Sequence, residues 1–258
     1  MRIAVLGAGA IGAYVGAALA RGGAQVSLVA RGEHLAAIQR DGVRVRSPRG
    51  DFSARVAATS DPAEIGPVDV VFLGLKANSY PQVGPLLRPL LGPDTGVVAA
   101  QNGIPWWYFH ALPGPFTGRR LESVDPGGAV SAAIPPERAI GCVVYCSTEI
   151  AEPGVIRHLE GTRFSIGEPD GSLSARCQAL SAAMVAGGLK CPVEPNLRND
   201  VWIKLMGNIA FNPLSALTRA TMVRIARHPG TRQLVTSIME ETLAVARSVG
   251  VAPEVSIS

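Results

Sequence analysis

A glycine-rich segment near the start of the chain constrains the fold more than any other feature of the sequence. The apolar run Ile3 to Leu6 before it is short enough to be one buried strand, and the alanine-rich stretch Tyr14 to Arg21 after it predicts a helix. A strand, a tight glycine turn and a helix in this order are typical of dinucleotide-binding sites. We therefore expect this segment to bind a cofactor pyrophosphate at the positive end of the helix dipole. Its residues are Gly7, Ala8, Gly9, Ala10, Ile11 and Gly12.

The same part of the chain allows a second interpretation. The span Ile3 to Ala20 carries no charge and reaches about 18 residues, the length of a membrane-spanning helix. Met1-Arg2 ahead of it also resembles the start of a signal peptide. However, seven alanines and four glycines make the span only mildly apolar, and a second strand, Gln25 to Val29, follows almost at once. We therefore favour cofactor binding and expect no membrane partner.

The end of the second strand indicates which dinucleotide is bound. NAD-dependent enzymes usually carry Asp or Glu about 20 residues after the glycines, where the acid binds the ribose 2′-hydroxyl group. In this sequence Ala30-Arg31 stands there instead. A guanidinium at this place is suited to a bidentate contact with a 2′-phosphate. Arg31 therefore predicts NADP(H), and the competing interpretation is a solvated surface arginine.

Composition narrows the class of protein. Of the 258 residues, 47% are hydrophobic and 17% are charged, which is enough apolar material for a sizeable core. The net charge of +4 comes without a lysine-rich run and fits anionic small molecules at least as well as nucleic acid, so we expect no nucleic-acid partner. The four cysteines form no CxxC pair and have no histidine at zinc spacing. We expect free buried thiols, a cytoplasmic protein and no metal site.

Two further apolar strands end in polar residues. Val68 to Leu75 is followed by Lys76, and Gly96 to Ala100 is followed by Gln101 and Asn102. Ligands of open α/β sheets bind beyond the carboxyl ends of the strands, so Lys76 and Asn102 are candidates for contact with cofactor or substrate. Strand-end lysines and Asn-Gly turns are also common without any function.

The rest of the first 195 residues predicts a mixed α/β arrangement. We expect helices over 33–41 and 172–186, an edge hairpin over 43–56, and strands over 139–148 and 154–166. Between Ile104 and Glu137 the periodicity is lost, although six prolines and the run Trp106-Trp107-Tyr108-Phe109 stand there. Aromatic residues argue against disorder, so we expect this stretch to be a lid over the site or a contact in a homodimer.

A second, helical part of the chain is expected after Pro195, which divides the chain into domains 1–194 and 195–258. Asn199 or Asp200 would cap a helix that reaches about Leu217, and Pro213 should bend it. A last helix is expected over 231–248.

One face of the helix that begins near residue 199 carries a polar stripe. Lys204, Asn208 and Asn212 are spaced by four residues and therefore share this face. Their neighbours on the helix are mostly apolar, which is unlike a solvated face of mixed charge. We take the stripe as a candidate active-site face, with an ordinary polar surface as the alternative.

Four segments together resemble the ketopantoate reductase (2-dehydropantoate 2-reductase) family. They are GAGAIGAYVGAALA with Arg31, LGLKAN around Lys76, QNG around Asn102, and KLMGNIAFNPLSALT from Lys204. The similarity runs through nearly the whole chain, and the last segment is by far the most specific. It implies an α/β fold with an N-terminal Rossmann-type dinucleotide-binding domain, an all-helical C-terminal domain, and the active site in the cleft between them. It also implies NADPH-dependent reduction of a 2-oxo acid, which makes pantoate on the route to coenzyme A.

The resemblance also implies roles for single residues. Lys204 matches the general acid of the family. The positions that match substrate contacts are Asn208, Asn212 and Asn102. The positions that match cofactor contacts are the glycine segment, Arg31, Lys76, Asn102 and Ser147.

The sequence departs from the family pattern at three places. The stretch Trp106 to Pro136 is longer than expected, and Met222 stands where some members have a polar substrate ligand. Beyond Ser258 we expect further helices with a Ser and a Glu that complete the site, so we expect the protein to continue in a C-terminal tail. Two alternatives remain open: a reductase of the same fold acting on a different 2-oxo acid, and a non-catalytic NADP(H)-binding sensor.

Overall fold

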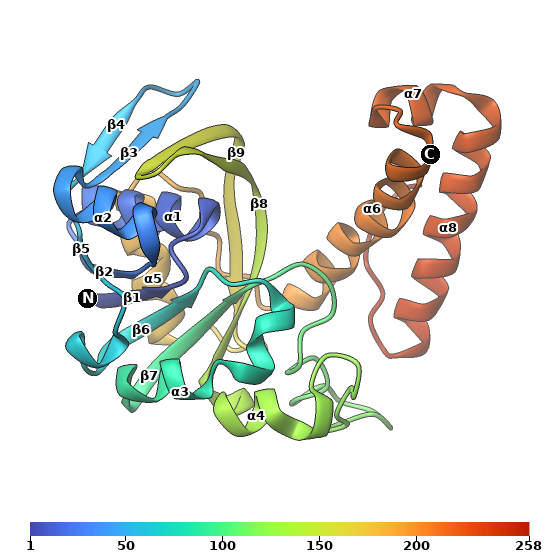
Figure 1. Ribbon diagram of the computed structural model, residues 1–258. Coiled ribbons are helices and arrows are strands. Elements are labelled where there is room, and N and C mark those ends of the chain that lie inside the picture. Colours follow the sequence, from blue (N-terminus) through green and yellow to red (C-terminus); the bar gives the residue numbers. More distant parts are fainter. Residues whose placement is uncertain (258) are drawn as a thin grey trace.

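Nine strands form one sheet in the computed structural model, which describes residues 1–257 (Figure 1). In chain order they are β1 (Arg2–Leu6), β2 (Gln25–Val29), β3 (Val43–Arg46), β4 (Phe52–Ala54), β5 (Ala57–Thr59), β6 (Val68–Leu73), β7 (Leu91–Ala100), β8 (Ala139–Glu152) and β9 (Val155–Gly167). Their order across the sheet is β4-β3-β9-β8-β7-β6-β1-β2-β5. The pairs from β8 to β5 are parallel, which is the arrangement of a Rossmann-type domain.

Helices cover both faces of this sheet, and three more stand beside it. They are α1 (Ala10–Arg21), α2 (Gly32–Asp41), α3 (Gly84–Leu87), α4 (Ala129–Ala133), α5 (Ala175–Ala186), α6 (Leu197–Thr218), α7 (Met222–Arg227) and α8 (Pro229–Ser248), with short 3-10 turns in the connections. Helices α1, α2 and α5 share one hydrophobic cluster with the sheet, and α3 and α4 share another. Helices α6, α7 and α8 form a separate group to one side (Figure 1). The predicted fold class is confirmed.

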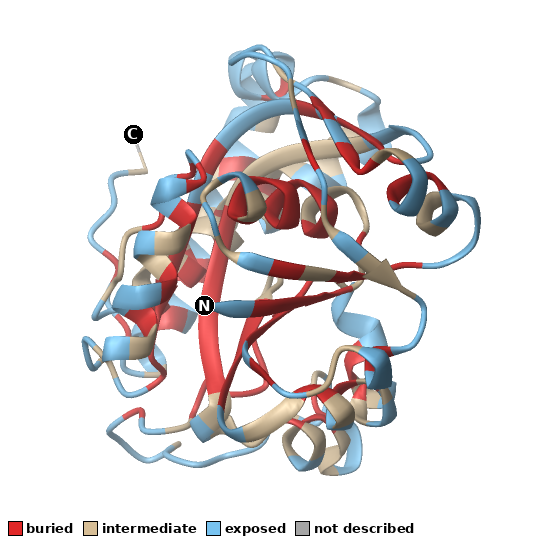
Figure 2. Cartoon of the chain, turned by 90° about the vertical axis from the view of Figure 1, so that its left-hand side faces the viewer, coloured by how far each residue is buried: buried red, intermediate tan, exposed pale blue. Residues whose placement is uncertain are grey.

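The central strand β1 shows why an unbroken apolar run is needed here. Ile3 and Val5 belong to the cluster with α1 and α5, whereas Ala4 and Leu6 belong to the cluster on the opposite face. Because successive side chains of a strand point to opposite faces, a strand covered on both sides is apolar at every position. Figure 2 shows the middle of the sheet as continuously buried.

The far edge of the sheet is built from two hairpins. Strands β3 and β4 pair antiparallel, with a turn in which Gly50 N–H donates to the carbonyl of Ser47 at 3.0 Å. Strand β3 also pairs in parallel with β9, which forms a long antiparallel hairpin with β8. The β3–β4 hairpin was predicted, and so were two strands in the region of β8 and β9, although not their pairing. Helix α5 begins at Ala175 rather than at residue 172, because the hydroxyl of Ser174 caps it by accepting from Cys177 N–H at 3.2 Å.

The aromatic run of the stretch 104–137 does not form the expected lid, while a subunit contact by the rest of the stretch remains a prediction. Its four side chains are buried inside the protein, with Trp107 2% and Tyr108 1% exposed. Trp106 and Trp107 belong to the cluster under α3 and α4, while Tyr108 and Phe109 pack against Trp202 of α6. The burial of this large apolar area stabilises the stretch although its backbone is irregular. The stretch therefore joins the sheet to α6 instead of covering the site.

Helix α6 begins earlier than predicted. Its N-cap is Asn196, so Asn199 and Asp200 both lie within the first turn. The buried guanidinium of Arg198 holds this turn in place by donating to the carbonyls of Tyr108, Pro169 and His110, at 2.7 to 2.8 Å. Three acceptors that lie far away in the sequence thus decide where α6 starts.

The last helices pack on α6. Helix α6 continues through Pro213 to Thr218, so the proline does not end it. Helix α8 was predicted over 231–248 and begins two residues earlier, at Pro229; it shares one apolar cluster with α6 through Ala246 and Trp202 and another through Val235 and Ala210. The short helix α7 between them was not predicted. Across residues 1–257, every helix is too short or too polar to cross a membrane.

Candidate functional site

Each of the three glycines of the first loop is needed for a different structural reason. Gly7 has a φ of +95°, and a Cβ there would meet Leu75 Cδ2 at 2.5 Å. A Cβ on Gly12 would overlap the carbonyl oxygen of Gly7 and lie 3.1 Å from Val5 Cγ1. Around Gly9 the nearest atom to an added Cβ is 3.9 Å away, so this part of the backbone is open to a ligand. A tight turn at Gly7, close helix–strand packing at Gly12 and an open backbone at Gly9 are the roles of the glycines in a dinucleotide-binding loop.

The start of α1 has the properties of an anion site. Its first helical hydrogen bond runs from Ala13 N–H to the Gly9 carbonyl at 2.8 Å, so the N–H groups of Ala10, Ile11 and Gly12 have no partner within the helix. The N-cap Gly9 provides no side-chain acceptor, and no acidic residue stands in the first turn. Free donors at the positive end of the helix dipole fit a pyrophosphate.

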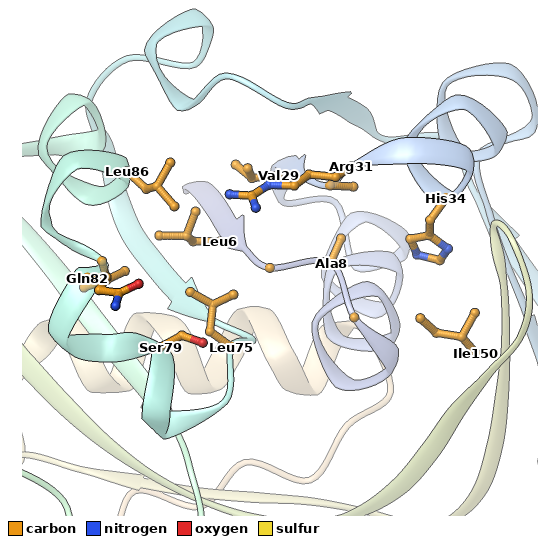
Figure 3. Close-up of a pocket in the computed structure, with 14 residues that line it drawn as sticks. Leu6, Ala8, Val29, Arg31, His34, Leu75, Ser79, Gln82, Leu86 and Ile150 are labelled. Carbon is orange, nitrogen blue, oxygen red and sulfur yellow. The ribbon is translucent and has the colours of Figure 1, made fainter. Parts of the chain in front are cut away.

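A cavity of about 610 Å³ lies between this loop and the end of β2. Arg31 lines it, and Figure 3 shows its guanidinium pointing toward Leu86 and Leu6 rather than toward His34. The Arg31 side chain is exposed and makes no hydrogen bond or ion pair with any other residue of 1–257. Its charge is therefore free for an anionic ligand, as the sequence predicts.

His34 also lines this cavity, although sequence reasoning did not select it. Its Nδ1 accepts a hydrogen bond from Gly154 N–H at 3.1 Å, which places the proton of the neutral ring on Nε2. Burial lowers the pKa of His34, whereas the nearby carbonyl of Ala8 acts in the opposite direction. The signal that was available is position: His34 is in the first turn of α2, three residues after Arg31.

A second cavity of about 700 Å³ continues the first one, since Gly7, Gly9, Leu75 and Ser79 line both. Lys76 and Asn102 reach it from the ends of their strands, and both are exposed. Lys204 also lines this cavity, from α6. The structure thus brings the glycine loop, both predicted strand-end residues and the predicted helix lysine to one cleft.

Lys204 has an unusual environment for a lysine. Its side chain is half-buried, and burial lowers the pKa of its ammonium group, an effect that Cys146 partly opposes. Its Nζ lies 4.7 Å from the centroid of the Tyr145 ring. Among residues 1–257 no carboxylate forms an ion pair with it. Lys204 therefore presents unshared N–H donors to the cleft.

Four predicted residues do not line either cavity: Gly12, which is buried against Gly7, and Asn208, Asn212 and Ser147. Asn208 is half-buried and Asn212 is exposed, and at 1.5 Å per residue they lie about 6 and 12 Å along α6 from Lys204. Ser147 is half-buried on β8, but its neighbours Cys146 and Thr148 line the cleft instead. The substrate role of the two asparagines and the cofactor role of Ser147 remain predictions.

Comparison with known proteins agrees with this geometry. Residues 3–107 match the family model described as ketopantoate reductase PanE/ApbA, and residues 196–257 match the model of its C-terminal part. The chain belongs to the ketopantoate reductase family. This confirms the resemblance found in the sequence.

Individual relatives cover nearly the whole chain. A 2-dehydropantoate 2-reductase of Mesorhizobium japonicum is 48% identical over 252 residues, 97% of this chain and 77% of that protein. The structure of a 2-dehydropantoate 2-reductase from Geobacter metallireducens superimposes with a TM-score of 0.83 at 33% identity, covering 99% of this chain and 78% of that one. A ketopantoate reductase structure from Ralstonia eutropha gives 0.81 at 30% identity, with 100% and 78% covered.

Membership of the family has direct consequences. Ketopantoate reductases are oxidoreductases with a Rossmann-like dinucleotide-binding fold, and the family implies a nicotinamide dinucleotide as cofactor. The cleft offers such a cofactor the free N–H groups at the start of α1 and the polar side chains of Arg31, Lys76 and Asn102.

Proposed function

We propose that this protein reduces a 2-oxo acid with NADPH, and that its substrate is 2-dehydropantoate (ketopantoate), which becomes pantoate in the biosynthesis of pantothenate and coenzyme A. The observation that carries the proposal is that Lys204 lines the same cleft as the glycine loop. The names of the relatives support the choice of substrate.

The cofactor would lie along the cleft, and it supplies the hydride when bound. The N–H groups at the start of α1 bind its pyrophosphate, and Arg31 binds its 2′-phosphate. Lys76 and Asn102 stand beside its reactive end, with Ser147 as a further contact. A protein of the same fold, described as D-mandelate dehydrogenase with NADH, has a TM-score of 0.78 at 19% identity. The fold is therefore compatible with NADH, and Arg31 is the basis for proposing NADPH.

Lys204 would provide the second half of the chemistry. Hydride addition turns the ketone oxygen into an alkoxide, which needs a proton. An ammonium group polarises the carbonyl and then donates that proton, which typically accelerates a reaction about 10² to 10⁴-fold. A lowered pKa makes the group a better acid near neutral pH, and half-burial strengthens its interaction with the developing charge.

The arrangement also supports a division into two domains, 1–194 and 195–258, with the cleft between them. The first supplies the cofactor site, and α6 supplies Lys204. Asn208 and Asn212 follow on the same helix, and with Asn102 they would bind the hydroxyl and carboxylate ends of the substrate.

Steady-state kinetics test the proposal. NADPH oxidation is measured with ketopantoate and with a panel of 2-oxo acids of different size. The proposal predicts the highest kcat/KM with ketopantoate. A higher value with another 2-oxo acid would favour a reductase of different specificity. NADPH binding without turnover of any acid would favour the non-catalytic sensor.

A further inference from the structure

The ammonium of Lys204 has an aromatic partner where a carboxylate would be expected. Asp200 stands one turn earlier on α6, but it is bound by Arg163, whose Nη2 lies 3.0 Å from its carboxylate. The same guanidinium also bonds Glu194 at 3.2 Å. Both nearby acids are thus engaged by Arg163, and the Tyr145 ring is left as the partner of Lys204 at 4.7 Å.

A β-bulge in β8 lies beside this ring. The pairing of β8 with β9 shifts register between Tyr145 and Ser147. On β9, Gly161 has a φ of +72°, and a Cβ there would overlap the carbonyl oxygen of Tyr145. Bulges re-aim side chains and are common beside active sites. Val144, Cys146 and Thr148 line the cleft as alternate residues of β8, so Tyr145 lies on the other face of the strand, where it meets Lys204.

We propose that Tyr145 is a positioning residue, whose ring face holds the Lys204 ammonium at the cleft without occupying its N–H donors. This inference rests on the proposed role of Lys204 as general acid. A carboxylate partner would accept hydrogen bonds from the ammonium and retain its proton. A ring attracts the cation through its quadrupole and accepts no proton, so the donors remain available for the substrate carbonyl.

The ring also compensates for the burial of the charge. Removing an ammonium from water favours the neutral amine, and the attraction of the ring favours the charged form. Burial raises the pKa of Tyr145 and lowers the pKa of Lys204, so it shifts the two pKa values in opposite directions. Loss of the ring should therefore lower the pKa of Lys204.

Other titratable and charged groups surround Lys204 and remain in place when the ring is changed. They are Cys146 on β8, Arg163 on β9, Glu194 before α6, Asp200 on α6 and Lys76 across the cleft. Arg163 lies over the same ring, with Cζ 5.4 Å from its centroid, and its charge is balanced by the two acids. Helix α8 packs on α6 with buried apolar side chains such as Val235 and Ala246.

The composition of the chain makes a direct measurement feasible. It has three lysines, Lys76, Lys190 and Lys204, so protein grown with lysine labelled with ¹³C at Cε gives three signals. Lys204→Ala assigns the signal of Lys204. In the wild type, the ring current of Tyr145 should move the ε-protons of Lys204 upfield of those of Lys190. Equal shifts would overturn the proposal without any variant of Tyr145.

Titration of these signals gives the decisive comparison. In Tyr145→Leu the pKa of Lys204 should fall by about half to one pH unit, whereas Tyr145→Phe keeps it near the wild-type value. The signal of Lys190, which is exposed, serves as the reference in all three proteins. An unchanged pKa of Lys204 in Tyr145→Leu would overturn the proposal. If Tyr145→Leu does not fold, Tyr145→Met serves in its place.

Measurements of turnover distinguish a positioning role of Tyr145 from a purely structural one. Tyr145→Leu should lower kcat about three- to tenfold and move the alkaline limb of the kcat pH profile to lower pH, with Tyr145→Phe restoring both. A loss of kcat that Phe does not restore would contradict the role of the ring. If the pKa of Lys204 shifts as expected but the wild type reduces no 2-oxo acid, the contact stands and the proposed function fails.

Discussion

Replacement of Arg31 by Asp should narrow or reverse the preference of the protein for NADPH over NADH. The guanidinium of Arg31 lines the cavity beside the glycine loop and has no partner in residues 1–257. In Arg31→Asp a 2′-phosphate would lose a charged donor and meet a negative charge. NADH, which lacks this phosphate, would lose nothing and gain an acceptor for its 2′-hydroxyl group.

The structure sets the size of the effect. A hydrogen bond to a charged group contributes about 1.5 to 3 kcal/mol, and the exposure of Arg31 favours the lower end of this range. Loss of the guanidinium should therefore cost roughly tenfold in kcat/KM for NADPH, and repulsion by Asp should increase this to about a hundredfold. Arg31 is also the N-cap residue of α2, without a side-chain capping bond. Asp is a preferred N-cap, so α2 should not be destabilised.

The assay is the ratio of kcat/KM for NADPH and NADH with a saturating 2-oxo acid. Arg49→Asp is the matched control, because Arg49 is exposed in the β3–β4 turn, lines neither cavity and gives the same change in net charge. Its ratio should equal that of the wild type. Equal ratios in wild type and Arg31→Asp would show that another residue recognises the phosphate.

Two further predictions concern substrate binding and acid stability. Asn208→Ala should raise KM for the 2-oxo acid by roughly 5- to 100-fold, because a lost hydrogen bond in a closed site costs about 1 to 3 kcal/mol. Asn212→Ala should have a smaller effect, because Asn212 lies a turn further from Lys204. NADPH affinity from fluorescence titration should stay constant in both variants, and its loss would place these residues against the cofactor. Burial raises the pKa of Glu168, but hydrogen bonds from Arg176 and Ser174 outweigh it and hold that pKa below its usual value. Its contribution to stability is therefore complete above the unfolded pKa of about 4.3 and is lost as pH falls through the folded pKa. Urea unfolding from pH 6 to 3 should show a steeper loss for the wild type than for Glu168→Gln, and parallel curves would contradict this.

The cofactor half of the site was predictable because its signals are local. The strand, the glycine turn and the helix follow one another within the first 21 residues, and steric demands at Gly7 and Gly12 leave little choice of residue. Arg31 and Lys76 could be placed because both directly follow strands whose carboxyl ends face one edge of a parallel sheet.

The rest of the site could not be predicted from the sequence, because it depends on contacts between segments that are distant in the chain. Helical spacing shows that Lys204, Asn208 and Asn212 share a face, but not how far that face extends along the cleft. The start of α6 is fixed by carbonyls that only the folded chain brings to Arg198. Cys146 and Thr148 line the cleft in place of Ser147 because successive side chains of β8 point to opposite faces, and only the folded sheet shows which face meets the cleft.

Single-turnover hydride transfer in Lys204→Ala tests the central claim most directly. With saturating NADPH and ketopantoate, the rate should fall by about two to four orders of magnitude, while NADPH binding and the folded structure are retained. Lys204→Arg should restore little, because a guanidinium holds its proton too tightly. Lys190→Ala, which removes an exposed lysine outside both cavities, should leave the rate unchanged. A rate near that of the wild type in Lys204→Ala would remove Lys204 from the mechanism.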